Sequence, residues 1–175
     1  MKKLISVLLA LTAFLFVLSA CGDDDGVVTL PPEDTGTPAD NTYFFVYQGT
    51  TVRPGDLWSG KAGGLLAKLG EPVSSSSSPS CAFQGLDKTF TFPGFIVLTY
   101  PDNDNDYVLN IQFTDDSVTT PAGIRIGSTE ADLTAAYGTG QKNGNAVVYT
   151  QGKTQIAAVV ENGTIKNLNY NYVEE

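Results

Sequence analysis

The chain has 175 residues, a net charge of −9 and no histidine. The missing histidine excludes Ser-His-Asp and Cys-His catalysis, His-ligated zinc sites and the side chain that most often acts as a general base near neutral pH. The acidic charge argues against a nucleic-acid partner, because a protein that binds nucleic acid favours a basic patch.

The sequence predicts that residues 1–20 are a secretory signal peptide. A basic start is followed by an apolar run from Leu4 to Leu18, and the segment ends in the small residues Ser19 and Ala20. The apolar run has about 15 residues, whereas a spanning helix needs roughly 20. We therefore expect cleavage of this segment and no permanent transmembrane helix.

The sequence Leu18-Ser19-Ala20-Cys21 resembles the lipobox of bacterial lipoproteins. The resemblance implies that the Cys21 thiol receives a diacylglyceryl group and that a peptidase cuts just before it. Two acyl chains give a stable membrane anchor. Removal of residues 1–20 takes away two lysines and no acidic residue, so the net charge falls to −11. We therefore expect the lipid to hold the protein on the cell membrane, outside the cytoplasm, at the cell surface or in the periplasm.

Residues 21–41 are predicted to be a disordered tether, because they are acidic, rich in Gly and Pro and without an apolar period. Residues 42–175 are then one α+β domain. Lipidation of Cys21 leaves Cys81 as the second and last cysteine, so we expect neither an intramolecular disulfide nor a Cys-rich metal site. Cys81 is expected to be a small buried residue at the start of a strand. A reactive or intermolecular thiol is the alternative.

The sequence of the first half of the domain predicts a strand, a helix and a group of short strands. The aromatic and β-branched run over 43–47 favours a strand. Helical spacing connects Trp58, Ala62, Leu65, Leu66 and Leu69, although three glycines weaken this helix, and Gly70 should end it. The serine run at 74–78 predicts a polar loop. Strands are then expected over 81–83, 88–92, 95–100 and 107–113.

The second half predicts a helix followed by three strands. Ser128-Thr129-Glu130 provides a hydroxyl cap and an acidic first turn, and Gly138 should stop the helix. Its inner face is expected to hold Leu133, Ala136 and Tyr137. The strands are expected over 146–150, 155–160 and 164–172, with Asn162-Gly163 as a tight hairpin turn between the last two.

The two halves share a pattern, which predicts a tandem repeat over about 43–119 and 120–175. Each half has a helix that ends in an apolar or aromatic residue and glycine, followed by a meander of strands. In the meander, an offset of 57 residues pairs Val108 with Ile165, Ile111 with Leu168, and Phe113 with Tyr170.

The segment TPAGIRIGST at 120–129, continuing through Asp132-Leu133 to Tyr137-Gly138, resembles a recurring unit of bacterial exported proteins. Those proteins share the tandem-repeat fold of β-lactamase-inhibitory protein and of small outer-membrane assembly lipoproteins. The resemblance implies an α+β fold with an antiparallel β-sheet and two short helices, or helical pairs, packed on one face. The other face would be free to bind protein. No inhibitor contact loop is present, so β-lactamase inhibition is not implied.

The run from Asp102 to Asp106 places oxygen ligands at alternate positions, as a calcium loop does. Tyr107 stands where the loop needs glycine, however, and Phe113 stands where it needs a bidentate glutamate. A solvated hairpin turn is the simpler interpretation, and we predict neither a metal site nor a cofactor.

We expect a lipid-anchored binding or assembly module of the bacterial cell envelope, not an enzyme, with an envelope or secreted protein as its partner. Tyr170 and Tyr172 share one face of the last strand and are candidate contacts if that face is uncovered. Two alternatives stay open. One is a histidine-free hydrolase that uses two carboxylates, and the other is a receptor for a small molecule or a peptidoglycan fragment.

Overall fold

The computed structural model describes residues 41–174, which form mostly antiparallel β-sheet with two short helices. Several predicted features lie outside the described residues. They are the signal peptide with the lipobox residues Leu18, Ser19 and Ala20, the lipid-attachment residue Cys21, and nearly all of the tether. Within residues 41–174, no helix is both long and apolar enough to cross a membrane.

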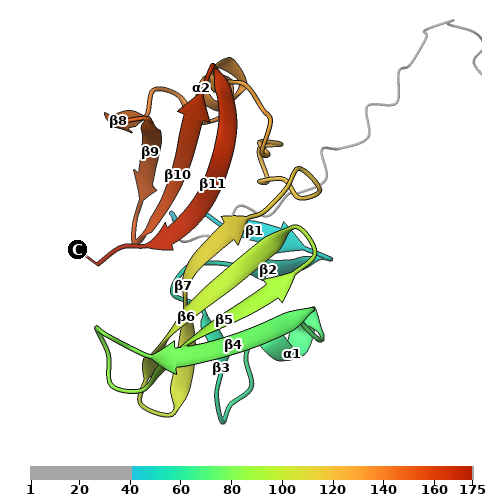
Figure 1. The fold of residues 1–175 in the computed structure, drawn as a ribbon, viewed down its shortest axis with the longest axis vertical. Helices are drawn as coiled ribbons and strands as arrows, with labels where there is room; N and C mark the ends of the chain where they lie inside the picture. The colour runs from blue at the N-terminus through green and yellow to red at the C-terminus, as the bar shows by residue number, and fades with distance from the viewer. Residues whose placement is uncertain (1–40, 175) are drawn as a thin grey trace, which may run out of the picture. The chain divides into compact units, whose positions relative to one another are not determined.

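The first half begins with a separate two-stranded hairpin and ends with four antiparallel strands (Figure 1). The hairpin consists of β1 (Phe45–Tyr47) and β2 (Thr50–Val52). It is followed by β3 (Leu57–Ser59) and helix α1 (Leu66–Leu69). The four strands are β4 (Ser74–Pro79), β5 (Leu86–Phe92), β6 (Phe95–Asp102) and β7 (Asn105–Phe113).

The second half repeats the order of one helix and four antiparallel strands. These are α2 (Glu130–Tyr137), β8 (Gln141–Asn143), β9 (Ala146–Gln151), β10 (Thr154–Glu161) and β11 (Thr164–Tyr172). The strands form one sheet in the order β4-β5-β6-β7-β11-β10-β9-β8, and β3 also pairs with β7. Because β7 and β11 are the last strands of their halves, the two meanders meet in the middle of the sheet and run outward in opposite directions.

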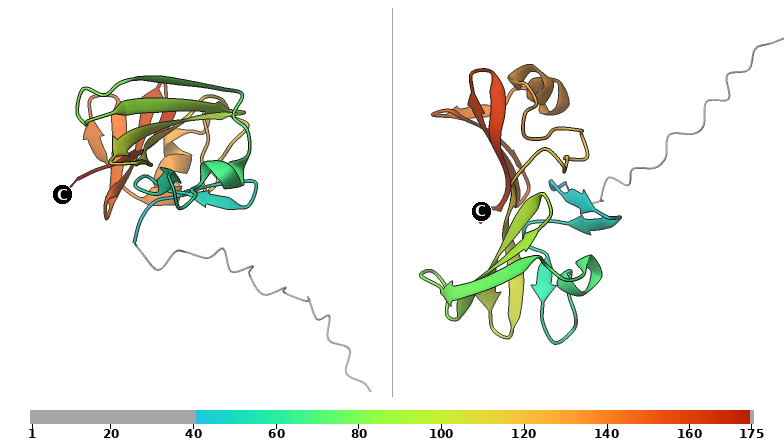
Figure 2. Two further views of the ribbon diagram at one scale, coloured as in Figure 1. Left: turned by 90° about the horizontal axis from the view of Figure 1, so that it is seen from below. Right: turned by 45° about the vertical axis from the view of Figure 1, so that its right-hand side comes forward.

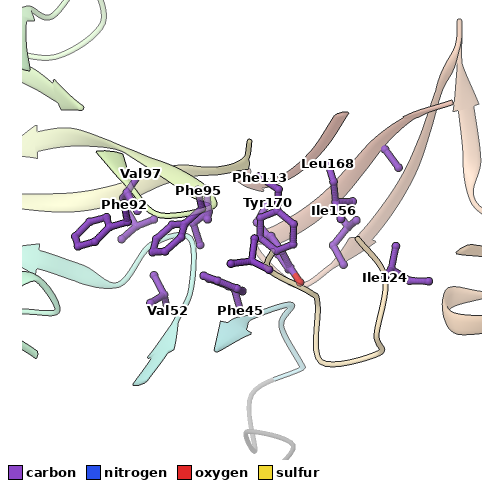
Figure 3. Packing of buried hydrophobic residues seen from close by; sticks show 14 of the residues in the cluster. Phe45, Val52, Phe92, Phe95, Val97, Phe113, Ile124, Ile156, Leu168 and Tyr170 are labelled. Atoms are coloured by element: carbon purple, nitrogen blue, oxygen red, sulfur yellow. The ribbon is translucent and has the colours of Figure 1, made fainter. Parts of the chain in front are cut away.

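The hydrophobic core lies on one face of this sheet, beneath the β1–β2 hairpin and the two helices (Figure 2). The Phe45 ring of β1 lies 5.0 Å from the rings of both Phe95 and Phe113, measured between centroids. Figure 3 shows Phe45 and Val52 against the side chains of the sheet. From α2, Leu133 is fully buried in the same core. Each large apolar side chain that is buried in this way contributes about 1.5–3 kcal/mol of transfer free energy.

The turns that precede β3 and α2 have the same geometry. Gly55 donates its N–H to the carbonyl of Val108 (2.7 Å), and Val108 donates back to the carbonyl of residue 56 (2.9 Å). In the second half, Gly127 donates to Ile165 (2.9 Å), and Ile165 donates back to the carbonyl of residue 128 (2.9 Å). Both glycines have a positive φ, +90° and +92°, which a residue with a Cβ rarely adopts. Each turn thus fixes the start of its half against the final strand of that half.

Strands β7 and β11 also carry a β-bulge at matching positions. In β7, Leu109 has no paired residue in β6, because Leu98 of β6 pairs with Asn110 and the next residue, Thr99, pairs with Val108. In β11, Lys166 has no paired residue in β10, because Val159 pairs with Asn167 and Val160 pairs with Ile165. The two bulged residues are 57 positions apart, which is the offset that the sequence pattern indicated. The six residues that this offset pairs are all buried.

The predicted helix over residues 58–69 is wrong for most of its length. Residues 57–59 are strand β3, and only Leu66–Leu69 are helical. Gly63 and Gly64 have φ values of +98° and +156°, which are incompatible with a right-handed helix. The apolar spacing arises instead because a strand, a glycine turn and one helical turn all place side chains in the same core.

The predicted loop at 74–78 and the predicted strand at 81–83 are also wrong. The serine run forms strand β4, which pairs with β5 over six residues. Residues 81–83 lie in a bend, where the Ser80 hydroxyl accepts hydrogen bonds from the backbone N–H groups of Ala82 and Phe83. Such local bonds compete with strand pairing. Cys81 is therefore exposed, and the expectation of a buried cysteine is wrong.

The second helix and the last hairpin are confirmed. Thr129 caps α2 in a capping box: its hydroxyl accepts from the backbone N–H of Asp132 (3.1 Å), and its own N–H donates to the Asp132 carboxylate (2.9 Å). Asn162 and Gly163 both have positive φ, as a tight type I′ turn requires. One detail of the helix is wrong, because Ala136 is exposed whereas Leu133 is buried.

Candidate functional site

The sheet face opposite the helices and the β1–β2 hairpin carries no covering element among the described residues (Figure 2). We call it the open face. Because side chains alternate along a strand, the residues between the buried positions point to this face. In the middle of the sheet they are half-buried amides: Asn110, Gln112, Asn169 and Asn171. The register aligns Asn110 with Asn171 across β7 and β11, and the Asn110 amide donates to the Asn171 side-chain oxygen (2.6 Å).

Four aromatic rings gather at one end of the open face, around Tyr100 of β6. Phe83 lies 4.9 Å from Tyr100, Tyr107 of β7 lies 5.7 Å away, and Tyr172 at the end of β11 lies 5.9 Å away, measured between ring centroids. The rings come from three strands and the loop between β4 and β5. The three tyrosines are half-buried, and Phe83 is 37% exposed. We call these four residues the aromatic cluster.

The surroundings of the aromatic cluster are acidic. Burial raises the pKa of the Tyr100 hydroxyl, and the nearby Tyr172 hydroxyl and the carboxylates of Asp102 and Glu174 raise the pKa further. Asp87 precedes the paired residues Lys88 and Thr99 by one position, which places it across from Tyr100. One Asp87 carboxylate oxygen is buried and has no hydrogen-bond partner among the described residues. The cluster therefore combines aromatic rings with negative charge.

A polar cluster on the covered face contains the buried carboxylate of Asp106, which is 7% exposed. Lys88 Nζ lies 2.7 Å from Asp106 Oδ2, and the Ser59 hydroxyl donates to the same oxygen (2.5 Å). Beside this ion pair lies a hollow of about 240 Å³ that is also lined by Asp104. Because Ser59 belongs to β3, Lys88 to β5 and Asp106 to β7, this arrangement is suited to holding these three strands together.

A larger hollow of about 730 Å³ lies between β2 and α1. Its lining contains no aromatic side chain and consists of Gly49, Thr50, Thr51, Arg53, Asp56, Leu57, Ala62, Gly64, Leu65 and Lys68. The aromatic-lined pocket that the receptor alternative requires is therefore not formed at this hollow. Among residues 41–174, no group of three or more cysteines or acidic residues is arranged to hold a metal ion. Residues 102–105 form the turn of the β6–β7 hairpin.

The two tyrosines that the sequence singled out have different positions. Tyr170 is fully buried in the core. Alternation along β11 would put Tyr172 on the same face, but Tyr172 is the last residue of β11, beyond the pairing with β7, and its ring lies 5.9 Å from that of Tyr100. Sequence reasoning missed the contributions of Phe83, Tyr100 and Tyr107. Burial alternates along β6 and β7 in the structure, but the β6 sequence FIVLTYPD is apolar on both faces and did not mark Tyr100. Phe83 had no alternation to mark it, because it lies in a loop.

The chain matches no protein-family model, no curated protein and no solved structure.

Proposed function

We propose that this chain is a lipid-anchored binding module of the bacterial cell envelope, without enzymatic activity, and that it binds a protein partner on its open face. The observation that carries the proposal is the aromatic cluster at the end of a sheet face that no helix of residues 41–174 covers. Tyrosine and other aromatic side chains are the most common anchors of protein interfaces. The amides in the middle of the face supply donors and acceptors for a polar interface.

The proposed membrane attachment depends on Cys21. If the segment after Cys21 is the tether that the sequence predicts, its roughly 20 residues would hold the domain on average about 25 Å from the membrane. That distance leaves the open face accessible to a partner. Replacement of Cys21 by Ala is expected to leave the protein uncleaved or to release it from membranes. A Cys21→Ala protein that is cleaved and stays membrane-bound would contradict the anchor.

We also propose that the domain arose by duplication of a unit with one helix and four strands, as in the fold that the sequence resembles. Three features support this: the repeated element order, the matching glycine turns at Gly55 and Gly127, and the bulges at Leu109 and Lys166. Duplication would explain the size of the open face, because two meanders joined through β7 and β11 make a sheet twice as wide as either one.

The hydrolase alternative has less support than binding. It requires two carboxylates that converge in a pocket, with one of them able to exchange a proton. Asp106 is the buried carboxylate, and its near neighbours are the ammonium of Lys88 and the hydroxyl of Ser59. These contacts occupy the Asp106 carboxylate and tie it to β3 and β5, which favours a structural role.

Site-specific photo-crosslinking in intact cells tests the binding proposal. Leu98 lies on the open face beside the aromatic cluster, and Val46 of β1 is 42% exposed on the hairpin that covers the other face. We expect a photoreactive phenylalanine at position 98 to give a discrete protein adduct, and the same residue at position 46 to give none. Equal adducts at both positions, or none at position 98, would contradict the proposal.

A further inference from the structure

We propose that the aromatic cluster receives an arginine side chain of the protein partner. This inference depends on the proposed function, since it names the chemical group that the open face would bind. The first reason is the ring arrangement. The face of an aromatic ring is negative and attracts a cation that lies within about 6 Å of its centroid. The rings of Phe83, Tyr107 and Tyr172 each lie within 6 Å of the Tyr100 ring, measured between centroids, and Phe83 is 37% exposed.

The second reason is the negative charge around the rings. The carboxylates of Asp102 and Glu174 lie close enough to act on the Tyr100 hydroxyl. Asp87 adds a carboxylate across from Tyr100, and its buried oxygen has no donor among the described residues. Because Asp87 is half-buried, its carboxylate is screened less than a fully exposed one would be. Lys88, which follows Asp87 in the chain, pairs with Asp106 on the covered face.

The third reason is the match of this site to guanidinium. A guanidinium group is planar, stacks on aromatic faces and carries five N–H donors for nearby carboxylates. A quaternary ammonium has no donor, so it would leave the carboxylates unbonded. A sugar could stack on the rings and donate hydroxyl hydrogen bonds to Asp87, Asp102 and Glu174, but it is neutral and gains no Coulombic attraction. Of these three groups, guanidinium is the one that combines stacking, hydrogen-bond donors and positive charge.

The test uses the full-length protein in detergent and two fluorescent peptides, nona-arginine and its uncharged analogue nona-citrulline. Binding is measured by fluorescence anisotropy at physiological salt. We expect nona-arginine to bind at least about tenfold more tightly than nona-citrulline. Phe83→Ala and Tyr172→Ala are each expected to weaken nona-arginine binding about 2- to 5-fold, which is the range of one exposed cation–π contact. Val73→Ala is the matched control, because Val73 is 72% exposed and lies outside the cluster.

Two outcomes would overturn the inference. Equal binding of the two peptides would show that charge is not recognised, and equal binding to wild type, Phe83→Ala and Val73→Ala would show that the rings play no part. Phe83 is in a loop, so its variant is expected to fold, and Trp58 fluorescence checks the folding of the Tyr172 variant. If position 98 still gives a crosslinked partner while arginine binding fails, the inference is wrong and the proposed function stands.

Discussion

Replacement of Lys88 by Met tests the role of the ion pair with Asp106. Methionine keeps the length and apolar stem of lysine but removes the ammonium, which leaves the Asp106 carboxylate with the Ser59 hydroxyl as its remaining partner. Removal of one member of a buried ion pair costs about 3–5 kcal/mol. The Lys88 side chain is 35% exposed and that of Asp106 only 10%, so water compensates for part of this loss. We expect the free energy of unfolding to fall by about 2–3 kcal/mol.

Urea denaturation followed by Trp58 fluorescence measures this loss. Trp58 is the only tryptophan of the chain, it is fully buried, and it is next to Ser59. Lys142→Met is the matched control, because its ion pair with Glu130 is exposed on both sides (71% and 40%) and should contribute less than about 1 kcal/mol. The reasoning is refuted if Lys88→Met lowers the free energy of unfolding by no more than Lys142→Met does.

Three further predictions concern stability and accessibility. Gly64→Ala should destabilise the domain by about 2–4 kcal/mol in the same urea assay, because the new Cβ would meet the Trp58 carbonyl, whereas Gly123→Ala has open space and should cost less. Thr129→Val should remove the α2 cap and cost about 1 kcal/mol. The Thr129 backbone N–H and, to a smaller extent, its hydroxyl donate to Asp132 and lower the pKa of that carboxyl, and Thr129→Val removes only the hydroxyl. The contribution of these bonds to stability is present above the ordinary carboxyl pKa and is lost as the pH falls through the lowered pKa. Thr129→Val should therefore reduce the acid sensitivity of the unfolding midpoint, and an unchanged pH profile would contradict this. Finally, Cys81 should react with a maleimide in the folded protein without lowering the unfolding midpoint, since it is exposed. If Cys81 reacts only after unfolding, its exposed position in the folded domain is wrong.

Local chemistry explains which parts of the fold could be predicted from the sequence. Asn162-Gly163 is a tight turn because both residues tolerate positive φ, and the α2 cap follows from Thr129 and Asp132. The alternating strands near the C-terminus were also recognisable. In each case the residues that decide the structure are within a few positions of one another, so the pattern in the sequence contains the cause.

Elements that depend on distant partners were missed. The serine run at 74–78 has low strand propensity, yet it becomes β4 because β5 offers it a complete row of backbone partners. The helix predicted over 58–69 failed because apolar spacing cannot distinguish one helix from a strand and a helical turn that share a core. The glycines at 63 and 64 already weakened the helix prediction, and in the structure their positive φ values interrupt the helix.

The sequence by itself determined the expected export signal, the candidate lipid-attachment residue Cys21 and the absence of histidine, because these depend on residue identity alone. The candidate site was decided by tertiary structure. Tyr100 and Tyr107 face each other in the β6–β7 hairpin, whereas Phe83 and Tyr172 come from distant parts of the chain. Strand pairing and the loop between β4 and β5 bring the other three rings within 6 Å of Tyr100. The same pairing buries Tyr170, two positions before Tyr172. A surface that is assembled from four separate segments has no local signature, because its members share a position in space and not a pattern in the chain.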